Sequence, residues 1–205
     1  MKEFDKIPEI NENADLQNPA WFSFYQDRKE RVIWLLTEID SGNYDNVAMI
    51  IDWNKEDKDI PIENRKPIKV IVASPGGSLD VTRTLSEIIR LSKTPVIGIA
   101  IGTVASGASM VYMSCHRKYA FNNVTFLLHK GSCDNLGGNY NELQQFMDNY
   151  KKDIEEMTNF YISHTKIEPE IIRNKLKEGD WYISITDAIE YGIVDEILES
   201  IDILL

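Results

Sequence analysis

The chain has few cysteines, no excess of basic residues and no long apolar run, and each absence argues against a class of protein. Its two cysteines, Cys115 and Cys133, form neither a disulfide framework nor a metal-ligand spacing, which fits a reducing compartment. The formal net charge of −11 disfavours a nucleic-acid binder, which would carry a basic patch. No apolar run approaches the roughly 18 residues that span a bilayer, so we expect no membrane insertion.

The first twenty residues are polar and acidic, and they lack the apolar segment of a signal peptide. We therefore expect residues 1–20 to form a mobile arm and the protein to be cytoplasmic. The remaining stretch, 21–205, is long enough for one sizeable core and short for two. A single domain is predicted there.

Apolar runs that suit buried strands alternate with segments that suit helices over the next hundred residues. The predicted strands cover 31–39, 68–74, 94–102, 118–123 and 124–131. The predicted helices cover 43–57, 78–93 and 105–115, and a charged loop with two prolines covers 58–67. This order predicts an α/β fold with a largely parallel sheet.

The pattern changes in the last third of the chain. Residues 139–165 carry apolar side chains three or four positions apart, which predicts one amphipathic helix of roughly 25 residues, about twice the usual length. Such a helix either protrudes and packs against another chain or lies across its own domain. Residues 169–179 predict a further helix, and 180–197 predict a turn, a short helix ending near Gly192 and a last strand.

Two small-residue turns, SPGGSL and GTVASGAS, each join a predicted strand to a predicted helix. Ser106 in the second turn either caps the helix or acts as a nucleophile. If Ser106 attacks a carbonyl, the oxyanion would meet the N–H of Gly107, because the first N–H groups of a helix are unpaired. The Gly76–Gly77 backbone is a suitable second donor, and two such donors form an oxyanion hole.

Three further residues are candidates for the same chemistry. Ser109 is a rival nucleophile, but one turn into the helix its hydroxyl is expected to bond back to a carbonyl. His129 ends an apolar strand, where sites gather in α/β folds, and a structural histidine is the alternative. Asp180, between a predicted helix and an aromatic turn, is either the acid of a triad or a turn aspartate.

Five segments occur in a characteristic order within residues 21–198. They are YQDRKERVIWLLTEID, VIVASPGGSL, IGTVASGAS, NVTFLLHKG and KEGDWYISITDAIEYGIVDEI. Together they resemble the proteolytic subunit of the Clp protease, a family of serine peptidases. The resemblance identifies Ser106, His129 and Asp180 as the catalytic serine, histidine and acid.

The resemblance also implies an assembly. It implies a crotonase-type fold of repeated β-β-α units, heptameric rings stacked into a tetradecamer around an inner chamber, and helix 139–165 as the handle that joins the rings. An ATP-driven unfoldase would feed unfolded polypeptides into the chamber. The chain carries no phosphate-binding loop motif, so ATP hydrolysis would belong to that partner. We expect neither a cofactor nor a metal.

The chain departs from the family pattern beside the nucleophile, where Gly107 stands in place of the usual methionine and Ala108 in place of a glycine. The leading hypothesis is a serine endopeptidase in which the Gly77 and Gly107 N–H groups hold the oxyanion. Three alternatives stay open: a ring subunit that has lost activity, an acyl-CoA enzyme of the crotonase fold, and a phage head-maturation protease with the same chemistry.

Overall fold

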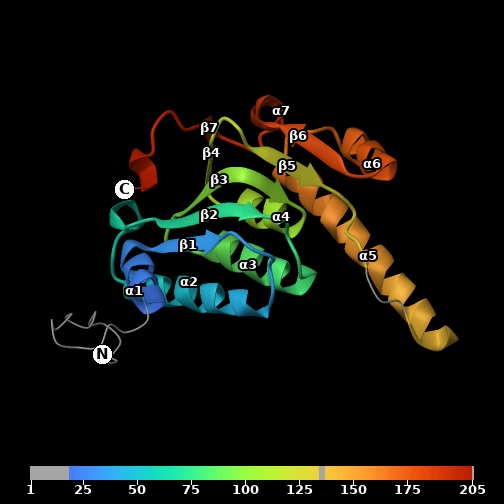
Figure 1. The fold of residues 1–205 in the computed structure, drawn as a ribbon, viewed down its shortest axis with the longest axis horizontal. Helices are drawn as coiled ribbons and strands as arrows, with labels where there is room; N and C mark the ends of the chain where they lie inside the picture. The colour runs from blue at the N-terminus through green and yellow to red at the C-terminus, as the bar shows by residue number, and fades with distance from the viewer. Residues whose placement is uncertain (1–18, 134–136, 205) are drawn as a thin grey trace.

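The computed structural model describes residues 19–133 and 137–204, which fold around a seven-stranded sheet (Figure 1). Its strands are β1 (Val32–Leu35), β2 (Ile68–Ser74), β3 (Val96–Ala105), β4 (Arg117–Ala120), β5 (Thr125–Leu128), β6 (Trp181–Ser184) and β7 (Glu196–Ile197). The main path follows the order β1-β2-β3-β4-β7, with parallel neighbours throughout. β5 runs parallel to the end of β3, and β6 pairs with β5 in the antiparallel direction.

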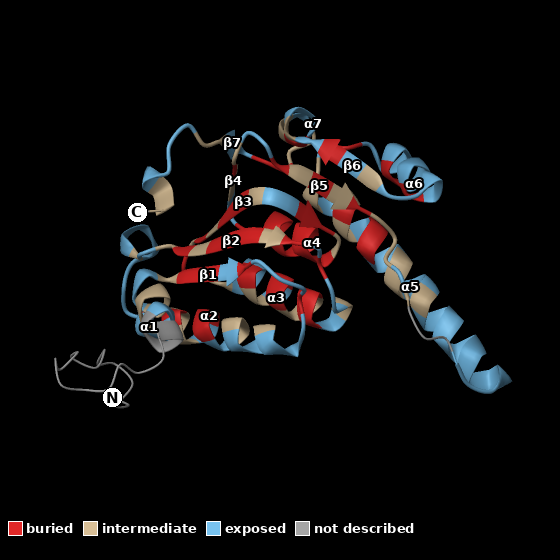
Figure 2. Ribbon diagram, viewed as in Figure 1, coloured by how far each residue is buried: buried red, intermediate tan, exposed pale blue. Residues whose placement is uncertain are grey.

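Helices cover one face of this sheet. The helices of the described residues are α1 (Pro19–Glu30), α2 (Tyr44–Glu56), α3 (Leu79–Leu91), α4 (Gly107–Met113), α5 (Tyr140–His164), α6 (Pro169–Glu178) and α7 (Ile185–Glu190), with short 3-10 helices at Ser41–Asn43, Ile62–Asn64 and Asp202–Leu204. Of these, α2, α3 and α4 cover the face that holds the main core. In Figure 1, α3 and α4 lie behind the strands, and Figure 2 shows the buried residues gathered in the strands and along these helices. The main core lies between the sheet and α2, α3 and α4.

The opposite face of the sheet carries a smaller apolar cluster around Val32, Ile71 and Ile99. Side chains alternate between the faces along a strand, so Val70 points into the main core while Ile71 points away from it. Residues 203–204 near the C-terminus pack against this second cluster. Because β2 and β3 are apolar on both faces, their sequences are continuous apolar runs.

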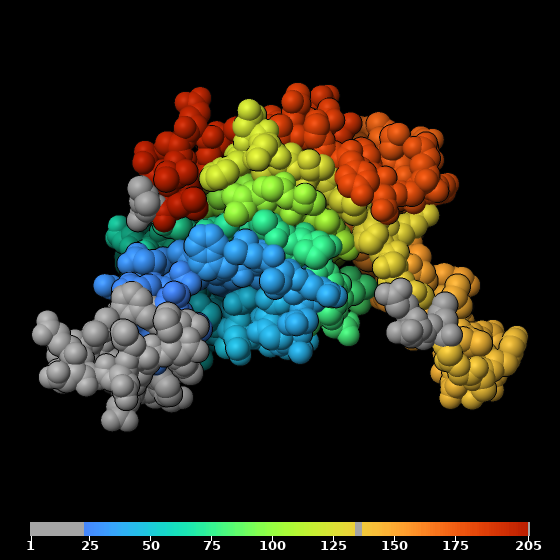
Figure 3. Space-filling model, in the orientation of Figure 1, coloured from blue at the N-terminus to red at the C-terminus, as the bar shows by residue number. Residues whose placement is uncertain are grey.

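The longest helix, α5, extends beyond the rest of the molecule (Figures 1 and 3). A capping box starts it: the Asn139 side chain accepts from the Glu142 N–H, and the Glu142 carboxylate accepts from the Asn139 N–H. Its second half reaches the core through Met157 and Tyr161. Four large hydrophobic side chains of its outer half are exposed: Tyr140, Leu143, Phe146 and Met147.

The predicted α/β fold with a largely parallel sheet is confirmed, and so is a single helix of about 25 residues near 139–165. Residues 1–18 of the expected arm lie outside the described residues, and its last two residues belong to α1. Periodicity does not predict α1, because the apolar residues of PAWFSFYQDRKE gather in its first half. The turn expected after residue 180 is wrong for 181–184, which form β6, and β3 continues to Ala105 instead of ending at 102.

No helix in the described ranges combines the length and the apolar character that a membrane crossing needs. The longest of them, α5, carries seven charged side chains between Glu142 and Glu156. The apolar residues that it exposes therefore form a stripe and do not encircle the helix.

Arg31, directly after α1, ties the N-terminal helix to the core. Its backbone is left-handed, with φ of 58°, and its guanidinium donates to both carboxylate oxygens of Asp57 at 2.6 and 2.8 Å. The Thr94 hydroxyl donates to the same carboxylate at 2.8 Å. The hydrogen bond from Arg31, followed by the one from Thr94, holds the pKa of Asp57 below its ordinary value despite burial.

Candidate active site

Ser106 and His129 follow two neighbouring parallel strands, β3 and β5, at the carboxyl end of the sheet. Ala105 pairs with Leu127 in the ladder, and the Ser106 N–H continues it by donating to the Leu127 carbonyl at 2.9 Å. This register brings the two side chains together, with His129 Nε2 2.6 Å from Ser106 Oγ. That is hydrogen-bond distance, so a base lies next to a hydroxyl that it can deprotonate.

The backbone of Ser106 is strained. Its φ of 54° and ψ of −126° lie outside the regions that residues with a side chain normally occupy. The Ser106 side chain makes no capping hydrogen bond to α4. A sharp, strained strand-to-helix turn holds the nucleophile in serine hydrolases of another fold and exposes its Oγ in the same way. The conformation therefore favours the nucleophile over the helix cap.

The glycine turn at Gly76 and Gly77 packs directly against the turn that holds Ser106. A Cβ on Gly76 would lie 2.7 Å from the Ser106 Cβ and 2.8 Å from the Gly107 nitrogen, so only a glycine fits. Ile39 holds the other side of the turn, because its N–H donates to the Gly76 carbonyl and its carbonyl accepts from Ser78. Peptide groups alternate in an extended chain, so the Gly77 N–H faces away from Ile39. The two turns therefore form one continuous surface.

Asp180 reaches His129 from the opposite side to Ser106. β5 and β6 are antiparallel with Leu128 opposite Trp181, so the next positions, His129 and Asp180, also face each other. The distance from His129 Nδ1 to Asp180 Oδ1 is 3.7 Å, which is longer than a hydrogen bond. The Asp180 side chain is 58% exposed, against 19% for that of His129. The carboxylate is thus on the correct side of the ring without being bonded to it.

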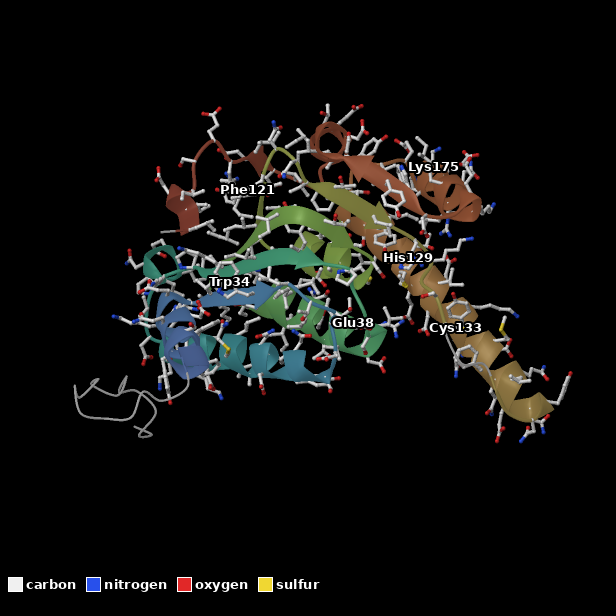
Figure 4. All side chains as sticks on the ribbon, in the orientation of Figure 1. Trp34, Glu38, Phe121, His129, Cys133 and Lys175 are labelled. Atoms are coloured by element: carbon white, nitrogen blue, oxygen red, sulfur yellow. The ribbon has the colours of Figure 1, made fainter. Side chains whose placement is uncertain are left out.

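A cleft of about 540 Å³ opens beside these residues. Its walls include both turns, His129 and the loop after it, and Phe146, Tyr150 and Met157 of α5. Figure 4 shows three of the lining residues, Glu38, His129 and Cys133, at the same end of the sheet. The space is large enough for several residues of an extended peptide, and both polar backbone and apolar side chains line it.

The other candidates have structural roles. The Ser109 hydroxyl is buried and donates to the Val104 carbonyl at 2.8 Å, so its expected bond back to a carbonyl is confirmed. His116 accepts a backbone hydrogen bond from Val96 through Nδ1 at 2.9 Å. His164 stacks on Phe160 with ring centroids 3.8 Å apart. His129 alone among the three histidines lines this cleft.

The two cysteines are free thiols in different surroundings. Cys115 is buried behind the sheet, and burial raises its pKa to about 12. Cys133 lines the cleft, where the sequence gives no hint of it. Within residues 19–133 and 137–204, no three His, Cys, Asp or Glu side chains converge in a way that would hold a metal ion.

The contribution of α5 to the cleft is not predicted from the sequence. The Tyr150 hydroxyl donates to the Gly131 carbonyl at 2.9 Å and so fixes the loop that follows His129. Desolvation by burial raises the pKa of Tyr150. Asp153 of α5 also lines the cleft, and it pairs with Arg83 of α3 at 2.7 Å. The spacing of its apolar residues predicts the helix α5, but such spacing does not indicate which loop the helix contacts.

Comparisons with known proteins agree with this architecture. The sequence model of the Clp protease family matches residues 17–201. An ATP-dependent Clp protease proteolytic subunit from Dehalococcoides mccartyi is 26% identical over 196 residues, 94% of each chain. The subunit from Deinococcus radiodurans is 21% identical over 204 residues, covering 97% of this chain and 95% of that one. Among solved structures, a mutant of ClpP1 from Listeria monocytogenes has a TM-score of 0.73 at 21% identity, covering 88% of this chain and 98% of that one.

Proposed function

Because the chain belongs to the Clp protease family, we propose that it is a serine endopeptidase subunit of a self-compartmentalised protease. The observation that carries this proposal is the 2.6 Å contact between His129 Nε2 and Ser106 Oγ, made in a cleft beside two glycine-containing turns. A serine and a histidine at this distance, with backbone N–H groups next to them, have the parts needed for acyl transfer.

The proposed reaction uses the triad in two steps. His129 Nε2 takes the proton from Ser106 Oγ as the oxygen attacks a peptide carbonyl. The N–H groups of Gly77 and Gly107 hold the oxyanion, and the imidazolium then gives its proton to the leaving amine. Water attacks the acyl-enzyme with His129 again as the base, which releases the second product and restores Ser106.

Asp180 has the role of the acid in this proposal. Its carboxylate faces Nδ1 of His129, where it would hold the ring in the tautomer that leaves Nε2 free to accept a proton. The 3.7 Å separation means that a small movement of the exposed side chain has to complete the hydrogen bond. The same separation favours a second candidate function, a ring subunit whose own activity is low.

The proposed substrate is an unfolded polypeptide, and the proposed partners are further copies of this chain and an ATP-dependent unfoldase. The relatives named above carry ATP dependence in their names. Four exposed hydrophobic residues on the outer half of α5 support packing against another copy, since an apolar stripe in solvent is costly. We propose heptameric rings joined through α5 into a tetradecamer.

Labelling with a fluorophosphonate probe tests the chemistry. The assembled protein, sized by light scattering, is incubated with the probe, and the modified residue is found by peptide mass. We expect labelling at Ser106, its loss in Ser106→Ala, and its retention in Ser109→Ala, which removes the rival hydroxyl. An assembled protein that stays unlabelled contradicts the proposal and favours the ring subunit of low activity.

A further inference from the structure

Thr82 on α3 packs directly against Gly107, the first residue of α4. The Thr82 side chain is completely buried. A Cβ at Gly107 would collide with the Thr82 hydroxyl oxygen and would lie 3.3 Å from both the Cβ and the methyl group of Thr82. Among the described residues, the Thr82 hydroxyl has no hydrogen-bond partner. The hydroxyl oxygen therefore lies against the Cα of Gly107 and makes no hydrogen bond within the described residues.

Glycine is required at 107 for space and not for backbone conformation. Gly76 and Gly77 have φ values of 92° and 151°, which residues with a side chain rarely adopt. Gly107 does not have a positive φ, and it is the first residue of an ordinary α-helix. An alanine could adopt this backbone, so the collision with Thr82 is the specific reason for glycine at this position.

Thr82 also connects the two sides of the proposed oxyanion hole. It lies five positions after Gly77, in the first turn of α3, and its N–H donates to the Ser78 carbonyl at 3.0 Å. One contact between the turns runs from Gly76 to the Gly107 nitrogen, and the second runs from Thr82 to the Gly107 Cα. Each contact is possible only because one of its two residues is a glycine, so two independent contacts fix the separation of the two turns.

We propose that Thr82 is a positioning residue for the oxyanion hole: its side chain presses on Gly107 and fixes the separation of the Gly77 and Gly107 N–H groups. The inference rests on the proposed function, in which those N–H groups hold the oxyanion. Thr82 does not line the cleft, so it acts through Gly107 and without touching the substrate. Thr82 acts through the space that its side chain occupies. That space leaves no room for a side chain at position 107, where this chain has a glycine in place of the family's methionine.

Single and double substitutions test this coupling in the assembled protein. Gly107→Ala alone is expected to lower kcat about 100-fold with little change in KM, since a displaced oxyanion donor weakens binding of the transition state only. Adding Thr82→Ala removes the hydroxyl and the methyl group, and kcat is expected to recover at least about tenfold. Thr82→Gly in the same background also removes the Cβ that would remain 3.3 Å away.

Ser86 supplies the matched control. It lies one turn later on α3 and is also buried with an unpartnered hydroxyl, but it is not among the nearest contacts of Gly107. Ser86→Ala is therefore expected not to rescue Gly107→Ala. Thr82→Val replaces a hydroxyl that has no hydrogen-bond partner among the described residues with a methyl group of similar size, and its kcat is expected to stay within about twofold of the parent.

The result that overturns the inference is a Gly107→Ala enzyme as active as the parent, a failure of both double variants to recover kcat, or an equal recovery with Ser86→Ala. If Gly107→Ala fails to fold, the singles decide: Thr82→Ala is expected to lower kcat at least about fivefold, while Thr82→Val is not. Equal kcat in these two singles would count against the role. A parent protein that the fluorophosphonate does not label contradicts the proposed function instead, so the two failures are distinguishable.

Discussion

Ser106 and Asp180 approach His129 from two differently built regions of the sheet. Ser106 follows β3, a ten-residue strand with parallel neighbours on both sides and helices behind it. Asp180 precedes β6, a four-residue strand that pairs with β5 alone and alternates between buried and exposed side chains. The first contact is 2.6 Å and the second 3.7 Å.

The difference follows from how many constraints act on each residue. Ser106 is held by its backbone bond to Leu127, by the contact with Gly76 and by the buried start of α4. Asp180 is held by the register of the β5–β6 pair, and its side chain is mostly in solvent. Ser106 and His129, the proposed nucleophile and base, are therefore preorganised by the core, while the proposed acid is brought near by the two-stranded β5–β6 ribbon at the edge of the sheet.

The largest effect on activity is expected for Ser106 and His129, the pair that the core holds; we call this pair the core side and Asp180 on the β5–β6 pair the ribbon side. His129→Ala should lower kcat by about 10⁴-fold or more, because it removes the proposed base for Ser106 and leaves the proposed oxyanion donors in place. Hydrolysis of a short fluorogenic peptide by the assembled protein measures it. His164→Ala, which removes a ring stacked on Phe160 outside the cleft, is the control. A similar loss in both variants would mean that assembly, and not the dyad, limits the rate.

β5 should also contribute more than β6 to the free energy of unfolding. Phe126 of β5 is fully buried, with its ring 5.3 Å from that of Tyr112, whereas Tyr182 of β6 is 64% exposed. Phe126→Ala is expected to lower the free energy of unfolding by about 3–5 kcal/mol. Tyr182→Ala is expected to change it by less than about 0.5 kcal/mol. Urea unfolding measures both, and equal losses would show that the ribbon carries as much of the core as β5 does.

Asp180→Asn tests the ribbon side. We expect kcat to fall about 10- to 100-fold with KM unchanged, less than for His129→Ala, because the carboxylate is exposed and not yet hydrogen-bonded to the ring. The same peptide assay measures it. Glu178→Gln, which changes an exposed carboxylate paired with Lys175, is the control. A loss as large as that of His129→Ala would show that the acid is fixed as firmly as the base when the enzyme acts.

The sequence carries enough information to find the core side. Continuous apolar runs mark β2 and β3, and residues that follow such strands, including Ser106 and His129, collect at one end of a parallel sheet. The resemblance adds Asp180, but periodicity does not reveal the strand that positions it. β6 has four residues, and Ser184 at its end already caps α7 by accepting from the Asp187 N–H. A strand this short leaves too few positions for an alternation to be visible.

Contacts between helices were beyond the reach of the sequence for a different reason. In the sequence, Thr82 is a polar residue next to the apolar face of α3, and Gly107 is part of a small-residue turn. Their meeting depends on how α3 and α4 cross behind the sheet, and no local pattern encodes a crossing point. The same holds for Tyr150, whose hydrogen bond to Gly131 depends on the path of α5.

The smallest effect concerns a second carboxylate, Asp57. Unlike the exposed Asp180, Asp57 is buried and accepts hydrogen bonds from Arg31 and Thr94. The pKa of Asp57 is lowered by the hydrogen bond from Arg31 first and by that from Thr94 as well. A folded pKa below the ordinary 3.8 means that this stabilisation is present above pH 3.8 and is lost as the pH falls through the folded pKa.

Thr94→Val should therefore lower the free energy of unfolding by about 1–2 kcal/mol at pH 7 and by less at an acid pH that is low enough for the folded protein to protonate Asp57. Urea unfolding at the two pH values measures the difference. Thr84→Val, which removes a hydroxyl bonded only to the Asp80 carbonyl of its own helix, should show no such dependence. A Thr94→Val effect that is equal at both pH values would mean that the hydroxyl supports packing and not the charge of Asp57.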